Sequence, residues 1–286
     1  MKPVDLHTHS TKSDGSYTPA ELVDYAVAKG LRAIALTDHD TIDGLQEAIL
    51  HAKMLAQEGQ PSVEVVPGIE FSTKYEKKDV HIVGLYISYA TAAFQAKLRE
   101  FVDSRINRNI RMCRKLQEAG IDITFDQLQS ENPDAVITRA HYAAYLLAHG
   151  YVKSRQDAFS QYLGDHTKYF VPREKVTPAQ AVALILEAGG VPILAHPPLY
   201  HMGQDKLDGL VSSLKDAGLM GIEAVYCSYT NQDERDMRKL ADKYDLLLSG
   251  GSDFHGVNKP GLDLGTGYGR LFVPEEFLDK IKDALS

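Results

Sequence analysis

The stretch Val4-Asp5-Leu6-His7-Thr8-His9-Ser10 begins as a short apolar strand and runs directly into two histidines. Side chains two residues apart on an extended strand point to the same face, so the imidazoles of His7 and His9 face one way. Two neutral imidazoles on one face form half of a metal site. A polar strand end that carries two histidines by chance is an equal alternative from these residues alone. The rest of the chain has to decide between them.

Further apolar runs along the chain also lead into polar, metal-competent residues. Leu31–Leu36 is followed by Thr37-Asp38-His39-Asp40, and Val63–Val66 is followed by Pro67-Gly68-Ile69-Glu70. A fourth run, Val80–Ile87, contains His81. The remaining strands are predicted at Val191–Ala195, which leads into His196, at Ile222–Val225, and at Leu246–Leu248, which leads into Ser252-Asp253-Phe254-His255.

Helical patterns separate most of these runs. Thr18-Pro19-Ala20-Glu21 places an N-cap threonine, a proline at the first helical position and a glutamate three residues after the cap. Thr177-Pro178 repeats the same opening. Strands that alternate with helices predict an α/β fold, and seven such strands predict a (β/α)7 barrel, in which functional residues gather at the C-terminal ends of the strands.

The alternation stops between residues 91 and 169. Phe94–Gln117 is a long basic stretch with apolar residues at helical spacing, and Phe125–Leu128 and Arg139–His149 indicate further helices. We therefore predict a barrel domain of residues 1–90 and 170–286, interrupted by a helical insertion, or cap, domain of residues 91–169.

Composition narrows the class of protein. The chain has 286 residues, 44% hydrophobic and 24% charged, and a formal net charge of −8. An acidic chain is a poor ligand for a long nucleic-acid duplex, so any phosphate is expected to be met locally by metals or a few placed cations. The sequence contains no run of 18 or more apolar residues, so no membrane span is predicted. The two cysteines predict no disulfide framework, and metal-competent residues from position 7 onward argue against a cleaved signal, so we expect a cytoplasmic protein.

Nine metal-competent residues occur at or beside the predicted strand ends. They are six histidines and three carboxylates: His7, His9, Asp14, His39, Glu70, His81, His196, Asp253 and His255. A lone histidine at a strand end is more often a structural residue than a ligand. Nine such residues at the same kind of position favour a metal centre instead.

The motifs that carry these residues resemble the polymerase-and-histidinol-phosphatase (PHP) family. The resemblance rests on the His-x-His start, Thr-Asp-His-Asp at 37–40, Gly-Ile-Glu at 68–70, His-Pro at 196–197 and Gly-Ser-Asp-x-His at 251–255. It covers residues 1–90 and about 170–286. It implies a distorted (β/α)7 barrel that holds up to three divalent metal ions.

The resemblance also implies how the residues divide among the ions. His7, His9, Glu70 and Asp253 would hold one ion, and Glu70 would bridge to a second ion held by His81 and His196. Asp14, His39 and His255 would hold a third. Imidazole and carboxylate ligands admit manganese, iron or zinc, and ligand type does not choose among them.

Such a centre favours phosphoester hydrolysis. Metal ions about 3.5–4 Å apart share a water, lower its pKa toward neutrality and offset charge on phosphoryl oxygens, so a metal-bridging hydroxide is the expected nucleophile. Residues expected nearest the reaction are Asp14, His39, Glu70, His196 and Asp253. Because the chain is acidic, we expect the positive charge that binds phosphate to come mostly from the metals.

The insertion offers candidate substrate-binding residues. Thr138-Arg139-Ala140-His141 resembles the Ser/Thr-Arg-x-His element of the PHP branch that acts on nucleoside bisphosphates and short 5′-phosphorylated RNA, with Ala140 where proline is expected. Arg139 could form a forked contact with a second phosphate, and His141 could donate to it. The alternative is the first turn of a helix with an ordinary exposed arginine.

Other polar residues have two open interpretations each. Asp5, Asp38, Asp40 and Ser252 flank the candidate ligands and could orient imidazoles, although Asp38 and Asp40 could equally be helix caps or solvated loop carboxylates. His201 could protonate a leaving oxygen or be a surface histidine. Three residues near the end of the insertion could add charge or a stacking ring, or simply lie at the surface: Lys168, Tyr169 and Arg173.

These observations predict a metal-dependent phosphoric ester hydrolase (EC 3.1) that acts on a small phosphorylated nucleotide, such as a nucleoside 3′,5′-bisphosphate or an AMP-like monoester. A cyclic phosphodiester, a sugar phosphate and histidinol phosphate are alternative substrates on the same scaffold. A non-catalytic metal-binding module and a metal-dependent C–N hydrolase are alternatives of other classes. The oligomeric state is left open.

Overall fold

The strands of the barrel form a single eight-stranded sheet in the computed structural model, which describes residues 2–76, 78–172 and 176–285. Its order is β7-β6-β5-β4-β3-β2-β1-β8. The strands are β1 (Pro3–Thr8), β2 (Ala33–Leu36), β3 (Glu64–Tyr75), β4 (Lys78–Leu85), β5 (Val191–Leu194), β6 (Gly221–Tyr226), β7 (Leu247–Gly251) and β8 (Val273–Pro274). The predicted α/β barrel is confirmed, with the two-residue β8 added as an eighth strand antiparallel to β1.

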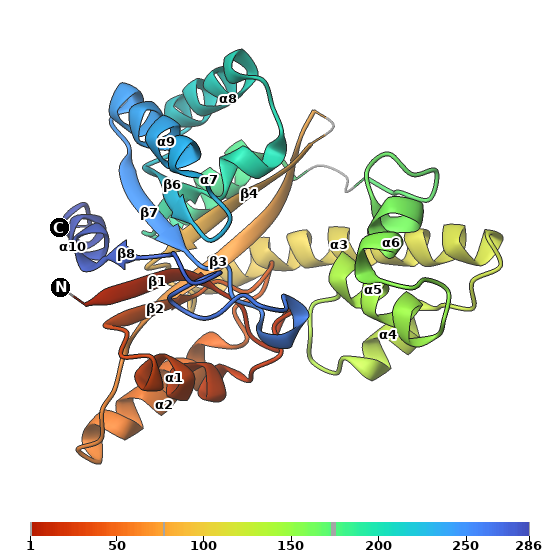
Figure 1. Ribbon diagram of the computed structural model, residues 1–286, viewed down its shortest axis with the longest axis horizontal. Helices are drawn as coiled ribbons and strands as arrows, with labels where there is room; N and C mark the ends of the chain where they lie inside the picture. Colours follow the sequence, from red (N-terminus) through yellow and green to blue (C-terminus); the bar gives the residue numbers. More distant parts are fainter. Residues whose placement is uncertain (1, 77, 173–175, 286) are drawn as a thin grey trace.

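Helices lie around the sheet and complete the α/β alternation (Figure 1). They are α1 (Pro19–Ala28), α2 (Leu45–Gln57), α7 (Pro178–Glu187), α8 (Gln204–Asp216), α9 (Asn231–Tyr244) and α10 (Glu275–Asp283). The predicted Thr-Pro openings at Thr18 and Thr177 are both present, and each threonine forms a capping box with the third residue of its helix. A turn in which Leu45 N donates to Ile42 O at 3.1 Å precedes α2, so this helix begins only at Leu45.

Two features of the sheet differ from the simple parallel barrel that the sequence predicts. β3 does not end before Glu70 but continues to Tyr75, and β4 runs antiparallel to both β3 and β5. Glu70 and His81 therefore lie within a β-hairpin, not at strand ends. Because β4 is antiparallel, its N-terminal half reaches the same end of the barrel as the C-terminal ends of its parallel neighbours. His81 lies at the site because β4 runs in this reversed direction.

Two apolar clusters form the core of the barrel domain, one on each face of the sheet. One packs the outward face of the sheet against the surrounding helices, with Ile34, Leu36 and Ile69 among its fully buried members. The other joins alternate strand residues such as Leu6 to Phe277 and Ile281 of α10. Residues at and just after the end of β1 are hydrogen-bonded to those that follow β7 and so connect the two sides of the sheet. His9 N donates to Phe254 O and Asp253 N donates to His7 O, each at 2.9 Å. The backbone around the candidate ligands is thus held on both sides.

The segment between β4 and α7 contains only helices among its described residues: α3 (Ala92–Glu118), α4 (Phe125–Glu131), α5 (Arg139–Ala148), α6 (Arg155–Ala158) and the π-helical turn η1 (Phe159–Leu163). It has its own apolar cluster, which includes Tyr142 and Leu146. The long α3 belongs to both parts, because Leu98 packs in the barrel core and Met112 in the cluster of this segment. The division of the chain into a barrel domain and an insertion domain of residues 91–169 stays a proposal. Residues 91–169 are called the cap below.

No helix within the described residues is long and apolar enough to cross a membrane.

Candidate metal centre

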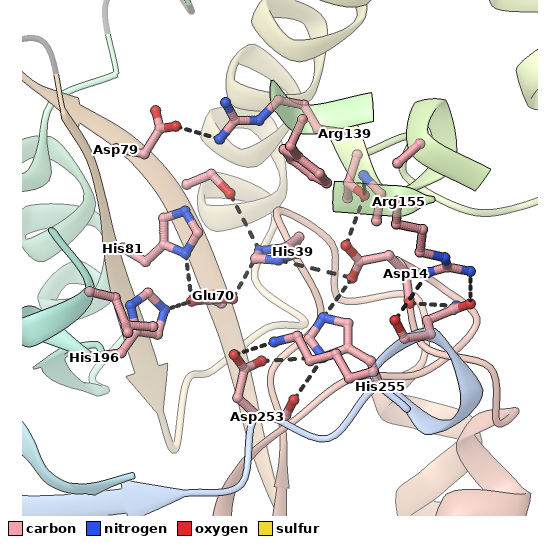
Figure 2. A pocket seen from close by; sticks show the side chains of 18 of the residues that line it. Asp14, His39, Glu70, Asp79, His81, Arg139, Arg155, His196, Asp253 and His255 are labelled. Atoms are coloured by element: carbon pink, nitrogen blue, oxygen red, sulfur yellow. Dashed lines mark hydrogen bonds and ion pairs between the residues drawn. The ribbon is translucent and has the colours of Figure 1, made fainter. Parts of the chain in front are cut away.

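All nine predicted ligands lie together at the end of the barrel that faces the cap. Seven of them line a cavity of about 600 Å³ between barrel and cap (Figure 2), and the other two, His7 and His9, are fully buried. Their nitrogen and oxygen atoms form four overlapping groups, each spanning no more than 4.8 Å: His9, Asp14, His39 and His255; His7, Glu70 and His196; His7, His9 and Asp253; His39, Glu70 and His81. The division among three ions that the resemblance implies remains a proposal.

Glu70 lies at the centre of this arrangement. Its Oε1 is 2.8 Å from His81 Nδ1 and 3.1 Å from His196 Nε2, and its Oε2 is 2.9 Å from His39 Nδ1. Burial alone would raise the pKa of this carboxyl, but the surrounding imidazoles hold the pKa well below its usual value. Glu70 therefore stays ionised and offers both oxygens to neighbouring positions, as a bridging ligand must.

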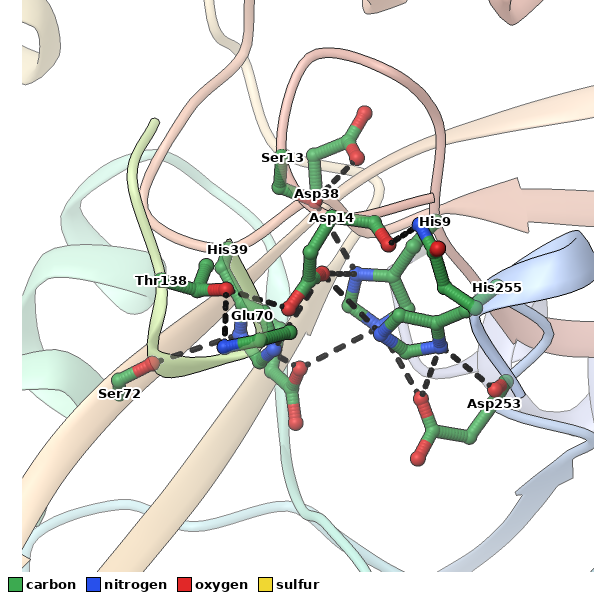
Figure 3. Close-up of polar contacts among 12 residues, drawn as sticks. His9, Ser13, Asp14, Asp38, His39, Glu70, Ser72, Thr138, Asp253 and His255 are labelled. Atoms are coloured by element: carbon green, nitrogen blue, oxygen red, sulfur yellow. Dashed lines mark hydrogen bonds and ion pairs between the residues drawn. The ribbon is translucent and has the colours of Figure 1, made fainter. Parts of the chain in front are cut away.

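Asp14 forms a second focus and links the barrel to the cap (Figure 3). Its Oδ1 is 3.1 Å from His255 Nε2, and its Oδ2 accepts a hydrogen bond of 2.8 Å from Thr138 Oγ1. Thr138 is the N-cap of α5, and the His141 Nδ1 accepts from the Thr138 backbone N–H at 2.9 Å. The N-cap residue of α5 is thus hydrogen-bonded to Asp14, a candidate ligand.

The predicted substrate residues occupy different positions. Arg139 lines the cavity, but its guanidinium already donates to Asp79 (2.5 Å) and Asp165 (2.8 Å). His141 is buried and lines a smaller adjacent hollow that it shares with Asp14, so its imidazole supports the start of α5. Direct contact of Arg139 or His141 with a phosphate stays a prediction.

The flanking polar residues brace loops beside the candidate ligands. Asp5 accepts from Ser252 and from Gly265 N, and its burial raises its pKa to about 6. Asp38 accepts from Ser10 and from Ser13 Oγ, and that hydroxyl is 3.4 Å from His9 Nδ1. Asp38 reaches an imidazole through this serine, and Asp40 does so through Ser72, whose N–H donates to Asp40 Oδ1 and whose Oγ is 3.3 Å from His39 Nδ1.

His201 and the three residues near the end of the insertion have the following places. His201 is exposed and is not among the described residues that line the cavity. The Lys168 ammonium lies 4.8 Å from the Tyr169 ring centroid. Arg173 lies outside the described residues.

Sequence reasoning missed Glu223, which orients two ligands. This carboxylate is 1% exposed in the middle of β6, where its Oε1 is 2.8 Å from His7 Nδ1 and its Oε2 accepts from His196 N at 2.7 Å. A proton on His7 Nδ1 leaves the lone pair of Nε2 free to face the centre of the site. The signal was a single acid inside the otherwise apolar run Ile222–Val225.

The cavity is also more cationic than the net charge suggests. Five basic side chains line it: Arg105, Arg108, Arg139, Arg155 and Lys259. Three of these cations pair with carboxylates: Arg105 with Asp40, Arg139 with Asp79 and Asp165, and Lys259 with Asp253. The expectation that positive charge comes mostly from metals stays a prediction. Within the described ranges, Arg155 donates only to Asn258, through Asn258 O at 3.0 Å and Oδ1 at 2.9 Å, and pairs with no carboxylate.

The residues present fit divalent metal ions. The Nε2 atoms of His7 and His9 are buried and form no hydrogen bond of good geometry with any described residue. Both lie 3.4 Å from Glu70 Oε2. Buried polar atoms are rarely left without a partner, and convergent imidazole and carboxylate donors are those that manganese, iron and zinc bind.

Comparison with known proteins agrees with this geometry. A family model described as the PHP domain matches residues 5–181. The chain belongs to the PHP family. A 5′-3′ exoribonuclease of Haemophilus influenzae is 38% identical over 254 residues, which cover 89% of this chain and 90% of that protein. A 3′,5′-nucleoside bisphosphate phosphatase of Chromobacterium violaceum is 37% identical over 267 residues, covering 93% and 91%.

A solved structure supports the same conclusion. A candidate metal-dependent phosphoesterase of Bifidobacterium adolescentis superposes with a TM-score of 0.84 at 27% identity, covering 98% of this chain and 96% of that one. This PHP protein is therefore a metal-dependent phosphoesterase, a hydrolase of phosphoric esters (EC 3.1).

Proposed function

We propose that this PHP enzyme hydrolyses a small phosphorylated nucleotide, a nucleoside 3′,5′-bisphosphate or an AMP-like monoester, at a centre of three divalent metal ions. One observation carries the proposal: the nine metal-competent residues meet in a cavity that also contains an arginine without a carboxylate partner in the described chain. The cavity of about 600 Å³ is of the size that takes a small ligand rather than a duplex.

The proposed ligands are those that the sequence predicts. His7, His9, Glu70 and Asp253 would hold one ion; Glu70, His81 and His196 a second; and Asp14, His39 and His255 a third, each manganese, iron or zinc. When bound, such ions supply Lewis-acid charge and an activated water for in-line attack on phosphorus. Asp14, His39, Glu70, His196 and Asp253 are the proposed catalytic subset.

The chain's own residues would bind and orient the rest of the substrate. Phe159 of the cap and Phe170, which directly follows the cap, line the cavity and offer apolar surface to a nucleoside. Thr138 holds Asp14 in place, and His141 holds Thr138. Arg139 could meet a phosphate only by giving up part of its contact with Asp79 or Asp165, because both of its terminal nitrogens are engaged.

Arg155 is the better-placed cation for a second phosphate. Asn258 fixes its guanidinium in the cavity, and Asn258 Nδ2 donates to Asp14 O at 2.9 Å, so Arg155 is anchored next to the proposed metal site. Its remaining charge meets no carboxylate of the described chain. A guanidinium with spare charge and donors is suited to a phosphate.

The proposed function predicts phosphate release that depends on metal. Protein reconstituted with Mn²⁺ should release orthophosphate from a nucleoside 3′,5′-bisphosphate faster than from AMP, and a chelator should abolish the release. A colorimetric phosphate assay measures both, with histidinol phosphate in the same panel. Chromatography of the products follows cyclic nucleotides and amide substrates, because their hydrolysis releases no orthophosphate. A metal-replete preparation that hydrolyses none of the phosphoesters would contradict the proposal, and turnover of amides alone would favour a C–N hydrolase.

Substitution of Arg155 should separate the two kinds of nucleotide. Arg155→Gln removes a charged hydrogen-bonding group, worth about 1.5–3 kcal/mol, so kcat/KM for the bisphosphate should fall about 10- to 100-fold. The value for AMP should stay within about threefold if Arg155 binds only the second phosphate. Lys153→Gln, at a neighbouring exposed position, is the matched charge control. An equal loss for both substrates would instead assign Arg155 to holding the cap.

A further inference from the structure

Asp253 is held by its backbone between two other candidate ligands. It follows β7 and has a left-handed backbone, with φ 55°. Its N–H donates to His7 O at 2.9 Å, and its own carbonyl oxygen lies 2.8 Å from His255 Nδ1. Aspartate adopts such a φ more readily than most non-glycine residues, and here the two backbone contacts hold it there. The direction of the Asp253 side chain is therefore strongly constrained.

The two carboxylate oxygens of Asp253 have different partners. Oδ2 accepts a hydrogen bond from Tyr226 OH and another from the Lys259 ammonium, each at 2.5 Å. Oδ1 faces the imidazoles and is 3.2 Å from His9 Nε2. Figure 2 shows Asp253 beside His255 in the cavity.

Tyr226 and Lys259, the two donors to Asp253 Oδ2, are themselves held in place. Tyr226 ends β6, where it pairs with Gly251 of β7, and it is 5% exposed. Lys259 is held by its backbone, where its N–H donates to Gly256 O at 3.2 Å. Asn258, the residue before Lys259, is tied to Arg155 of the cap and to Asp14 O.

We propose that Lys259 and Tyr226 are positioning residues that hold Oδ2 of Asp253 and so present Oδ1 alone to the metal centre. A carboxylate that is free to rotate can bind through either oxygen or through both, which changes the geometry offered to the ion. Two charge-assisted hydrogen bonds on one oxygen remove that freedom. Neither Lys259 nor Tyr226 belongs to the predicted ligand set. The proposal rests on the proposed role of Asp253 as a ligand.

Metal uptake by the apoprotein tests this positioning role without any substrate. Lys259→Met and Tyr226→Phe should each weaken binding of Mn²⁺ about 10- to 100-fold, the range typical of partners that orient metal ligands. Lys259→Arg keeps the charge and should recover most of the affinity. Equilibrium dialysis with Mn²⁺ alone, followed by metal analysis, gives the affinity and the number of ions bound. Lys153→Met and Tyr268→Phe, both at exposed positions, are the matched controls.

The possible outcomes separate this inference from the proposed function. Unchanged Mn²⁺ affinity and stoichiometry in both variants would overturn the positioning role, even if activity falls. Absence of Mn²⁺ uptake by the wild-type protein would overturn the proposed metal centre as well. If Lys259→Met does not fold, Tyr226→Phe decides alone, since it removes one hydroxyl from the same oxygen. A double variant should lose less than the product of the two single effects, because both groups act on Oδ2.

Discussion

Glu70→Gln should lower kcat/KM for the phosphoester substrate by at least about a thousandfold. The Glu70 carboxylate has histidines on both of its oxygens, and no other described carboxylate approaches as many candidate ligands. A neutral amide of the same shape keeps one oxygen but turns an NH₂ group toward the other position. Loss of a bridging anion should remove several kcal/mol of charge stabilisation in the transition state, and about 4 kcal/mol corresponds to a thousandfold change in rate.

The control for this substitution lies on the same strand. Glu64 begins β3 at the other end of the barrel, where it accepts from Tyr86 OH at 2.8 Å and pairs with Lys282. Glu64→Gln should leave both activity and metal content within about twofold. Metal analysis of the Glu70→Gln protein should show fewer bound Mn²⁺ ions than in the wild type. Full activity and a full metal complement in Glu70→Gln would show that this carboxylate is not a bridging ligand.

Much of the site follows from local sequence patterns. An apolar run that stops at a polar residue places that residue at a strand end, and helix signals such as Thr18-Pro19 give the intervening elements. Side chains from distant segments then meet because parallel strands bring their C-terminal ends to one side. This reasoning locates His7, His39 and His196 from short windows alone.

The direction of a strand is a different matter. Val80–Ile87 is an apolar run whether it lies parallel or antiparallel to its neighbours, so the reversal of β4 leaves no local trace. Pro67-Gly68 also suggests the end of a strand, yet β3 continues through it. A Cβ on Gly68 would lie 2.8 Å from a Thr37 methyl and 3.0 Å from Gly84 O, so this glycine allows close packing of strands instead of ending one.

Charged residues inside apolar patterns carry information that the predictions above do not use. Glu223 interrupts a buried strand, and Arg105 falls on the apolar stripe of the long cap helix α3. A charge in such a place is buried and must have a partner, but its partner is distant in sequence and cannot be identified from spacing. Asp40 illustrates the limit, because neither a helix cap nor a solvated carboxylate describes it. It is fully buried and pairs with Arg105.

Removal of Arg105 should therefore destabilise the protein by about 3–5 kcal/mol, because it leaves a buried carboxylate without its cation. Arg105 is 4% and Asp40 0% exposed in their side chains, and Arg105 Nε donates to Asp40 Oδ2 at 2.8 Å. The same guanidinium donates to Ser72 Oγ at 2.7 Å, which joins α3 to the hairpin that carries Glu70. Chemical denaturation of Arg105→Met, monitored by circular dichroism, measures the loss of unfolding free energy.

A double-mutant cycle shows whether the buried charge causes the loss. Asp40→Asn suits the left-handed backbone at this position, φ 53°, and removes the charge that Arg105 compensates. The Asp40→Asn, Arg105→Met double variant should be at least about 1 kcal/mol more stable than Arg105→Met alone, because no unpaired ion remains buried. If the double variant is as unstable as the sum of the two single variants, packing of the arginine stem explains its contribution, and the ion pair contributes nothing beyond it. Since Asp40 N donates to Glu70 O at 3.0 Å, Arg105 and Asp40 would in that case support the hairpin that carries Glu70 through packing and not through their charges.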